Sequence, residues 1–182
     1  MKKTIDLGQA TRLINCGMLV LVTASDGDRA TITPCAWYMP LSKTPPLVAI
    51  ALAAKHFSSE AIQKSNEFAL NIPRWHHLDK VRACGAVSGR TQDKFALTSL
   101  TKLAAKTLSA TPLVGECCGH LECKLVSTRQ EGDHLIFTGQ VSAAVVEEEY
   151  FSKGFWDTRT LKLICHLGGN AYFASTFYSE FI

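Results

Sequence analysis

The sequence predicts a mainly β protein, a β-barrel with short helical additions. Strand-like runs of β-branched and apolar residues recur along the chain, turn residues join several of them into hairpins, and only a few short segments have helical spacing. With 182 residues, 47% of them hydrophobic, the chain is long enough to bury a full core. It contains no internal repeat or linker, so we expect residues 1–182 to form a single domain.

The first elements are predicted to be strands. The run MLVLVTA (18–24) and the strand-like sequence from Ala30 onward flank a turn at 25–28, which predicts a hairpin. Pro34 interrupts the second strand of this hairpin, and because proline has no N–H we expect the ladder to end there. The run LVAIALA (47–53) is apolar at odd and even positions alike, which predicts a strand buried on both faces and central in the sheet.

A short helix should follow, with Ser58 or Ser59 as its N-cap. The run EFALNI (67–72) predicts another strand, and the helical spacing of residues 75–84 predicts a second helix that stops at Gly85. A third short helix is expected before the pattern becomes β again.

The second half of the chain is predicted to be dominated by one long hairpin. The segments LECKLVSTRQ (121–130) and HLIFTGQVSAAVVEE (134–148) flank turn residues, and shorter strands are expected at 161–164 and 172–174. This makes about seven strands with two or three short helices. Antiparallel pairing should dominate.

Charge and composition exclude several classes of partner. A formal net charge of +3, with scattered Lys and Arg residues, gives no electrostatic footprint for nucleic acid. The longest strongly apolar run (47–54) is far shorter than the ~20 residues of a membrane helix, and the N-terminal lysines precede no apolar segment. Seven cysteines, an odd number, suit a reducing compartment, so we expect a cytoplasmic protein without a membrane partner whose cysteines are mostly free thiols.

The segment ECCGHLEC (116–123) contains four potential zinc ligands. If it is a strand, alternation directs Cys118 and His120 to one face and Cys117 and Cys123 to the other, so the four cannot converge on one ion. We therefore expect buried thiols here and no metal.

The residues after Pro34 could border a ligand. A strand edge without ladder partners leaves backbone groups free to bind something else, the small residues Cys35 and Ala36 would let a flat ring approach, and Trp37 could pack on it. An edge bulge followed by a core tryptophan is the alternative.

Two further segments have the chemistry of an anion site. In AKHFSSE (54–60), serine hydroxyls, N–H groups at a helix N-terminus and the cation of Lys55 could hold a phosphate, although an N-cap beside a solvated lysine is the more frequent outcome. The segment GAVSGRTQDK (85–94) adds the hydroxyl of Ser88 and the cations of Arg90 and Lys94, but lacks the GK[ST] ending of a P-loop.

Taken in order, these segments resemble the flavin reductase-like proteins with the FMN-binding split-barrel fold, and especially the flavoredoxin branch. The similar stretches are the strand ending in Trp37, then SKTPPLVAIAL, HFSSEAI, NEFALNIP, SGRTQDKF, GDHLIFTGQV and HLGGNAYF. The resemblance extends from about Asn15 to Phe173.

This resemblance implies a homodimer with FMN in a groove near the subunit interface. It places Thr31, Thr33, Cys35, Ala36 and Trp37 around the isoalloxazine ring, and Lys55, His56, Ser58, Arg90 and Lys94 around the ribityl phosphate, with Ser88 beside them. His134 is expected to reach toward the flavin from the later hairpin and Tyr172 to act as an aromatic lid, with a surface histidine and a core tyrosine as the alternatives.

The implied function is an FMN-binding oxidoreductase, an NAD(P)H-dependent flavin reductase that passes electrons to flavin or to a downstream acceptor, including a redox partner protein. The chain has no GxGxxG turn, so NADH or NADPH should bind only transiently. Hydride transfer requires no acid–base side chain, and none is predicted to be catalytic. The alternatives are a flavoredoxin-like electron-transfer protein that binds FMN without oxidising NAD(P)H, and a split barrel that has lost FMN.

Overall fold

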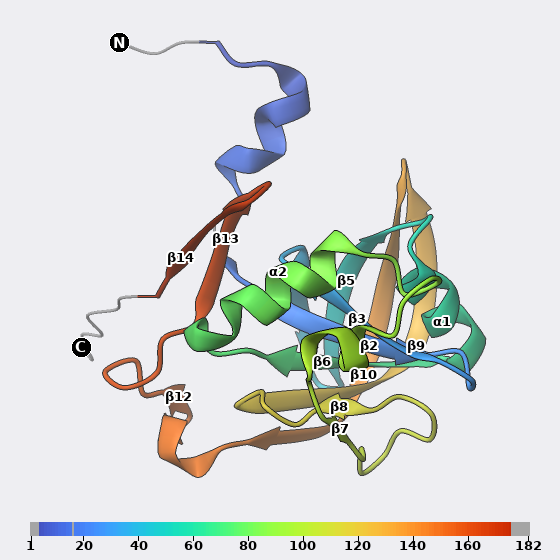
Figure 1. Ribbon diagram of the computed structural model, residues 1–182, viewed down its shortest axis with the longest axis vertical. Helices are drawn as coiled ribbons and strands as arrows, with labels where there is room; N and C mark the ends of the chain where they lie inside the picture. The colour runs from blue at the N-terminus through green and yellow to red at the C-terminus, as the bar shows by residue number, and fades with distance from the viewer. Residues whose placement is uncertain (1–3, 16, 176–182) are drawn as a thin grey trace.

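A seven-stranded antiparallel sheet forms the centre of the computed structural model, which describes residues 4–15 and 17–175 (Figure 1). The strand order is β3-β2-β6-β9-β10-β5-β4. These strands are β2 (Val20–Ser25), β3 (Ala30–Cys35), β4 (Tyr38–Lys43), β5 (Pro46–Ala53), β6 (Glu67–Ile72), β9 (Gly119–Glu131) and β10 (His134–Val146). The prediction of a mainly β fold built on hairpins is confirmed.

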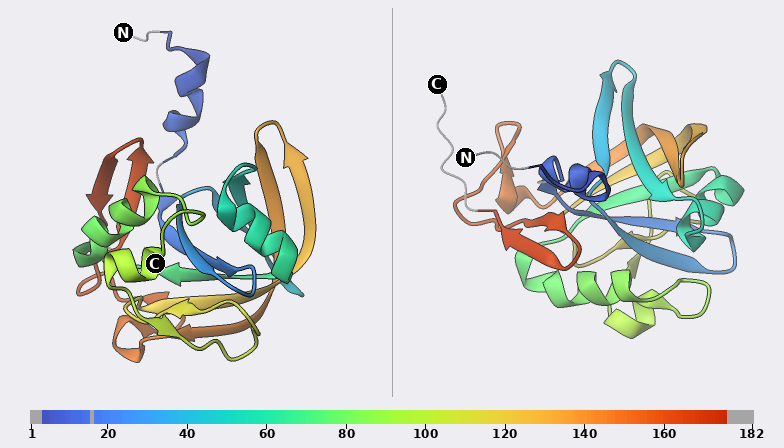
Figure 2. Two further views of the ribbon diagram at one scale, coloured as in Figure 1. Left: turned by 45° about the vertical axis from the view of Figure 1, so that its right-hand side comes forward. Right: turned by 90° about the horizontal axis from the view of Figure 1, so that it is seen from above.

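Short helices and small sheets surround this centre. The helices are η1 (Leu7–Leu13), α1 (Phe57–Ser65), η2 (Trp75–His77), α2 (Leu78–Ala86), α3 (Lys94–Thr98) and η3 (Glu148–Tyr150). A three-stranded sheet is formed by β1 (Gly17–Met18), β13 (Ile164–Gly168) and β14 (Ala171–Ala174). Two-stranded sheets are formed by β7 (Lys102–Leu103) with β8 (Leu113–Val114), and by β11 (Phe151–Ser152) with β12 (Phe155–Trp156). Figure 2 shows the β13–β14 hairpin beside α2 and the long β9–β10 hairpin on the side of α1.

The strand ladder of the central sheet is not closed into a complete barrel. Its two edge strands, β3 and β4, are nevertheless consecutive in the chain, and only Ala36 and Trp37 separate them. The chain itself therefore joins the two edges at this point. A backbone hydrogen bond of 2.8 Å from Ala51 N to Trp37 O fixes the crossing against β5.

The sequence led us to expect that the β2–β3 ladder ends at Pro34, and this prediction is wrong. Pro34 is paired with Leu21 of β2, and β3 continues to Cys35. The carbonyl of Ile32 accepts a hydrogen bond from Lys94 Nζ and so points away from β2. Pro34 is two residues after Ile32 in the same strand, so its backbone groups face the same side, away from β2. Its missing N–H therefore lies at the free edge of the sheet, and no hydrogen bond between β2 and β3 is lost.

Two other expectations need adjustment. The strand predicted to be central is β5, which lies between β10 and β4, one place from the edge of the sheet. Neither Ser58 nor Ser59 caps α1: the helix begins at Phe57, its N-cap is His56, and that side chain makes no capping hydrogen bond. Both serines instead lie buried in the first turn.

The cysteine-rich segment is packed differently from the predicted alternation. Cys118 and Cys123 share the main core cluster with Phe68 and Phe137, because Cys118 precedes the start of β9, while Cys117 belongs to a second cluster. No group of three or more His, Cys, Asp or Glu residues within 4–15 and 17–175 is arranged to hold a metal ion. In the same part of the chain, no helix is long and apolar enough to cross a membrane.

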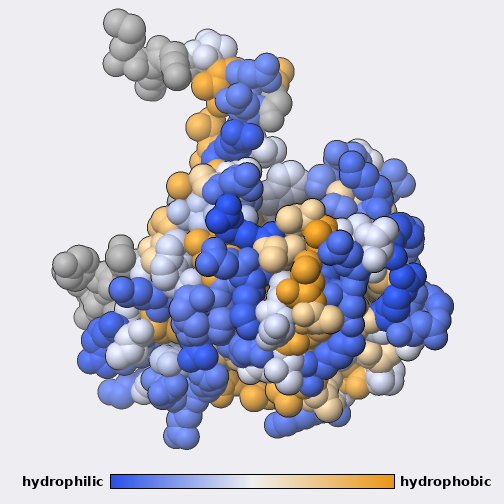
Figure 3. All heavy atoms as spheres, viewed as in Figure 1, coloured by the Kyte–Doolittle hydropathy of each residue, from blue (hydrophilic) through white to orange (hydrophobic). Residues whose placement is uncertain are grey.

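The N-terminal helix η1 stands away from the barrel, with hydrophobic groups at its surface (Figures 1 and 3). Leu7, Leu13 and Ile14 are 89%, 74% and 85% exposed. Exposed apolar side chains grouped on one projecting segment are typical of a contact with another molecule.

Two buried carboxylates hold the loop between β7 and β8 against the outer face of the sheet. Glu67 of β6 accepts hydrogen bonds from the backbone N–H groups of Ser109, Ala110 and Thr111. It also forms an ion pair with Lys124, with an N···O distance of 2.8 Å. Glu122 of β9 accepts from the N–H groups of residues 106 and 107. Burial raises the pKa of Glu67, but the ion pair and the three N–H groups outweigh burial and lower this pKa to about 2.

We expect Glu67→Gln to lower the free energy of unfolding at pH 7 by about 2 kcal/mol, the scale of a lost charged acceptor. The folded-state pKa lies below the ordinary value of 4.5, so this stabilisation is present above pH 4.5 and lost as pH falls toward 2. Urea denaturation across this range should show a shallower pH dependence in the variant. Glu131→Gln, at a largely exposed pair with Arg129, is the control and should change stability by only a few tenths of a kcal/mol; equal effects of the two substitutions would contradict the assignment.

Candidate functional site

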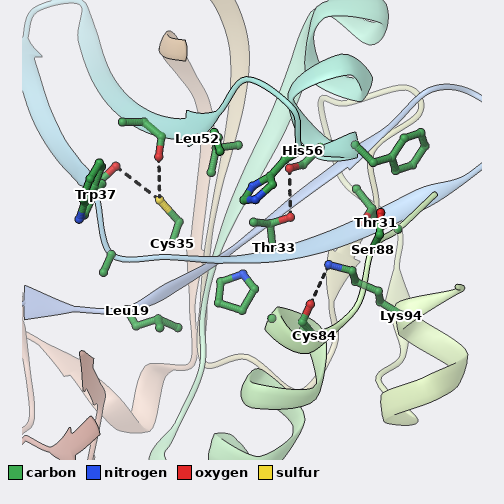
Figure 4. Close-up of a pocket in the computed structure, with 18 of the residues that line it drawn as sticks. Leu19, Thr31, Thr33, Cys35, Trp37, Leu52, His56, Cys84, Ser88 and Lys94 are labelled. Atoms are coloured by element: carbon green, nitrogen blue, oxygen red, sulfur yellow. Dashed lines mark hydrogen bonds between the residues drawn. The ribbon is translucent and has the colours of Figure 1, made fainter. Parts of the chain in front are cut away.

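A cavity of about 540 Å³ lies along the free edge of β3, between α1 and the C-terminal end of α2 (Figure 4). This volume is within the range of roughly 300–1,000 Å³ typical of cofactor and small-molecule sites. Twelve of the thirteen residues predicted from the sequence to bind cofactor line it: Thr31, Thr33, Cys35, Ala36, Trp37, Lys55, His56, Ser58, Ser88, Lys94, His134 and Tyr172.

Arg90 is the predicted residue that does not line the cavity. Its guanidinium pairs with Glu60 of α1, with one N–H···O contact of 2.6 Å, and lies 5.8 Å from the centre of the Phe57 ring. Arg29 lies 5.3 Å from the same ring and donates to the carbonyl of Arg90 at 2.7 Å. Arg90 therefore fastens the loop that carries Ser88 to α1.

The wall formed by β3 presents hydroxyl and thiol groups from alternate residues of one strand. Thr33 Oγ1 donates a hydrogen bond of 3.0 Å to Ser58 Oγ, and both side chains are buried. Cys35 Sγ makes a weak hydrogen bond of 3.4 Å to the carbonyl of Trp37. Because burial raises the pKa of Cys35 to about 12, its thiol stays protonated and contributes packing rather than a nucleophile.

Lys94 joins the β3 edge to the last turn of α2. Its Nζ donates hydrogen bonds to Ile32 O at 2.9 Å and to Cys84 O at 2.7 Å, and the side chain is only 5% exposed. Burial lowers the pKa of this ammonium. An ammonium has three donors, so one N–H remains beyond these two carbonyls, within the cavity lining.

The N-terminus of α1 contributes further donors at the same end. The first-turn N–H groups of a helix have no acceptor within the helix, and His56 does not cap them with its side chain. Phe57 and Ser58, which carry these groups, line the cavity with the exposed Lys55. Burial, and then the nearby Lys94 and His134, lower the pKa of His56. None of the described residues that line the cavity is acidic, so its electrostatics favour an anionic ligand.

The opposite end of the cavity is aromatic. The rings of Trp37 and His134 lie 4.8 Å apart, and those of His166 and Tyr172 lie 4.9 Å apart. Figure 4 shows Trp37 and Leu19 at one end of the cavity and Ser88 and Lys94 at the other. The site therefore combines an aromatic end with a cationic, hydroxyl-rich end.

These features fit FMN. A flat ring suits the aromatic end, and a phosphate suits the end that holds two lysines, hydroxyls and helix N–H groups. The backbone of Gly89 packs closely against Thr31 and Phe57 in the wall of the cavity. A Cβ at this position would lie 2.3 Å from Thr31 Oγ1 and 2.9 Å from Phe57 Cδ1, so no side chain fits here.

Sequence reasoning missed about half of the lining. Leu19, Leu52, Cys84 and their neighbours come from elements distant in sequence, and no local pattern distinguishes them from core residues. His166 and Gly169 lie within HLGGNAYF, a segment that carried the resemblance, and the paired glycines there were the available signal. The missed residues are Leu19, Pro34, Ala51, Leu52, Ala53, Phe57, Cys84, Gly85, Val87, Gly89, His166 and Gly169.

The chain belongs to the flavin reductase-like family, since the family model described as "Flavin reductase like domain" matches residues 13–163. It is similar to the uncharacterized protein YddH of Escherichia coli strain K12, with 34% identity over 179 residues, 94% of this chain and 93% of that protein. It is also similar to HsaB of Rhodococcus jostii, the reductase subunit of a flavin-dependent monooxygenase, with 28% identity over 70% of this chain and 61% of that protein.

Among solved structures, the flavoredoxin of Desulfovibrio vulgaris (Miyazaki F) superposes with a TM-score of 0.87 at 27% identity, over 99% of this chain and 96% of that chain. The resemblance predicted from the sequence, and the split-barrel fold class that came with it, are confirmed.

We expect Gly89→Ala to lower the free energy of unfolding by about 1–3 kcal/mol, because the new methyl group overlaps Thr31 and Phe57. Gly115→Ala is the matched control: its Cβ would meet Thr101 at 3.5 Å, an ordinary contact, and should change stability by less than about 1 kcal/mol. Thermal and urea denaturation measure both variants. Equal stabilities would show that the Gly89 wall is not tightly packed.

Proposed function

We propose that this protein is an FMN-binding oxidoreductase, an NAD(P)H-dependent flavin reductase that passes electrons from a nicotinamide to flavin or to a downstream acceptor. One observation carries the proposal. In a chain of the flavin reductase-like family, a single cavity gathers twelve residues predicted to bind FMN and, within its described lining, has cationic but no acidic side chains.

In this proposal each end of the cavity has a separate task. Lys55, Ser58, Ser88 and Lys94 hold the phosphate with the N–H groups of α1, while Thr33 and the segment 35–37 border the ring. Thr31, which the family resemblance assigns to the ring, lies against Gly89 at the cationic end (Figure 4). When bound, FMN supplies the hydride and electron chemistry, and the protein positions it and limits solvent access. A nicotinamide would approach transiently at the aromatic end, where His134 and Tyr172 line the cavity. The similarity to HsaB, named as a reductase subunit, supports this activity.

The assembly and location are part of the same proposal. The exposed Leu7, Leu13 and Ile14 of the N-terminal segment support a homodimer, because a second copy would cover them. A redox partner protein would receive electrons at the aromatic end of the cavity. The buried, unpaired thiols of Cys35, Cys84, Cys117, Cys118 and Cys123 support a reducing, cytoplasmic location.

A flavoredoxin-like electron carrier is the second candidate. The structural similarity to a flavoredoxin at 27% identity over nearly the whole chain favours it. Such a protein would use the same FMN site without oxidising a nicotinamide itself.

The two candidates give different results when the FMN-loaded protein is mixed anaerobically with NADH or with NADPH. For a reductase we expect the flavin absorbance to bleach with at least one nicotinamide, and added free flavin to sustain turnover. No bleaching with either would contradict reductase activity in favour of the carrier. A colourless protein with no FMN-induced rise in melting temperature would contradict both.

Ser58→Ala should weaken FMN binding about tenfold or more while leaving riboflavin affinity nearly unchanged, because riboflavin lacks the phosphate that this end of the cavity would hold. Fluorescence titration with both ligands measures the difference. Ser59→Ala is the matched control: its hydroxyl, in the same helical turn, donates to Ala53 O at 2.9 Å and does not line the cavity, so FMN affinity should stay unchanged. Equal weakening of FMN and riboflavin by Ser58→Ala would refute the phosphate assignment.

A further inference from the structure

A hydrogen-bonded bridge spans the aromatic end of the cavity, with Asn15 at its centre. Asn15 Oδ1 accepts a hydrogen bond of 3.1 Å from Trp37 Nε1, and Asn15 Nδ2 lies 3.3 Å from His166 Nδ1. Trp37 connects the two edge strands of the seven-stranded sheet, whereas His166 lies in β13 of the three-stranded sheet. One half-buried side chain, itself outside the cavity lining, therefore contacts both walls.

The donors and acceptors of this bridge are compatible in one arrangement. His166 Nε2 lies 3.0 Å from the carbonyl of Gly169, which can only accept, so Nε2 carries the proton. In the neutral imidazole Nδ1 is then an acceptor and takes the N–H of the Asn15 amide. The indole N–H of Trp37 can only donate and needs the amide oxygen. A carboxylate at position 15 would accept from Trp37 and could pair with His166 only as an imidazolium, and an apolar side chain would serve neither.

The segment that carries Asn15 is itself held against the β13–β14 hairpin. A Cβ at Gly168 would lie 3.3 Å from Cγ of Arg12, so the end of η1 packs closely on the turn of this hairpin. This contact holds the segment just before Asn15 near the β13–β14 wall.

Each residue held by Asn15 is paired with a second ring. Trp37 packs on His134 at an interplanar angle of 32°, and His166 packs on Tyr172 at 38°. All four rings line the cavity; Trp37 is 40% exposed and the other three are half-buried. The two ring pairs therefore belong to opposite walls of the aromatic end, and Asn15 joins these walls.

We propose that Asn15 is a positioning residue of this site: by holding Trp37 and His166 together, it fixes the spacing of the two ring pairs and thereby the fit of a flat, ring-containing second substrate. This rests on the proposed function, and the nicotinamide ring of NADH or NADPH is the substrate class tested. Asn15 is distant from the cationic end, where the phosphate would lie, so FMN affinity depends on it only weakly.

The first measurement needs no cofactor. The chain has three tryptophans, so labelling the full-length protein with 5-fluorotryptophan gives three ¹⁹F resonances, and the Trp37→Phe variant assigns one of them. Asn15→Leu should shift and narrow the Trp37 resonance, because the indole loses its acceptor. Asn15→Asp retains that acceptor and should leave the resonance near its original position. Asn170→Ala, at an exposed asparagine in the β13–β14 turn, is the matched control and should change nothing.

The second measurement uses the FMN-loaded protein. Asn15→Leu should raise the KM for the nicotinamide about tenfold, the scale of a lost hydrogen bond, while the Kd for FMN changes by less than about threefold. A purely structural role for Asn15 would instead weaken FMN and nicotinamide together.

An unchanged KM in Asn15→Leu overturns this proposal, whether or not the Trp37 resonance moves. So does equal loss of FMN and nicotinamide affinity. Failure of the unsubstituted protein to bind FMN, or to react with either nicotinamide, overturns the proposed reductase function and this proposal with it. Failure confined to the Asn15 variants leaves the proposed function standing.

Discussion

The architecture of this protein depends on the passage of the chain from one edge of its sheet to the other. β3 and β4 are the two edge strands, and the two residues between them are too few to form another strand. The barrel is consequently joined by covalent chain where a ladder would otherwise close it, and the outer backbone edge of β3 is left without a strand partner. Pro34 lies on β3, where its missing N–H leaves no donor unpaired at the free edge. Lys94 donates a hydrogen bond to the carbonyl of Ile32 on the same edge. The cavity lies along the same edge.

The helices around the cavity are positioned by polar contacts as much as by apolar packing. Lys94 links the β3 edge to the end of α2, Thr33 links β3 to the first turn of α1, and the Arg90–Glu60 pair holds the intervening loop to α1. Each contact contributes a donor or acceptor from a segment that also lines, or directly supports, the cavity. The stability of the fold and the shape of the site therefore rest on shared interactions.

The sequence predicted the hairpins, EFALNI and the short helices, because each of these has a local signal of alternation, turn residues or helical spacing. About half of the cavity lining was predicted, partly from hydroxyls and cations near a helix start and partly from the family resemblance. The sequence did not predict where α1 begins, because the first-turn serines resemble N-caps and only the buried bond between Thr33 and Ser58 reveals their place. Arg90 has the chemistry of a phosphate ligand, but its guanidinium forms an ion pair with Glu60 of α1. This pairing depends on the tertiary structure and has no signal in the local sequence. The hydrogen bond between Asn15 and His166 likewise depends on the tertiary structure, because residues 151 positions apart in the sequence come together there.

The protonated state of Cys35 also affects the chemical durability of the protein. A thiolate reacts with peroxide and begins the path to sulfenic and sulfinic acid, whereas a neutral thiol reacts slowly. In the proposed oxidoreductase, a cysteine bordering the cofactor would be exposed to such oxidants during turnover. Because burial keeps this sulfur protonated far above neutral pH, the site can contain a small, polarisable wall residue without becoming a point of oxidative self-inactivation.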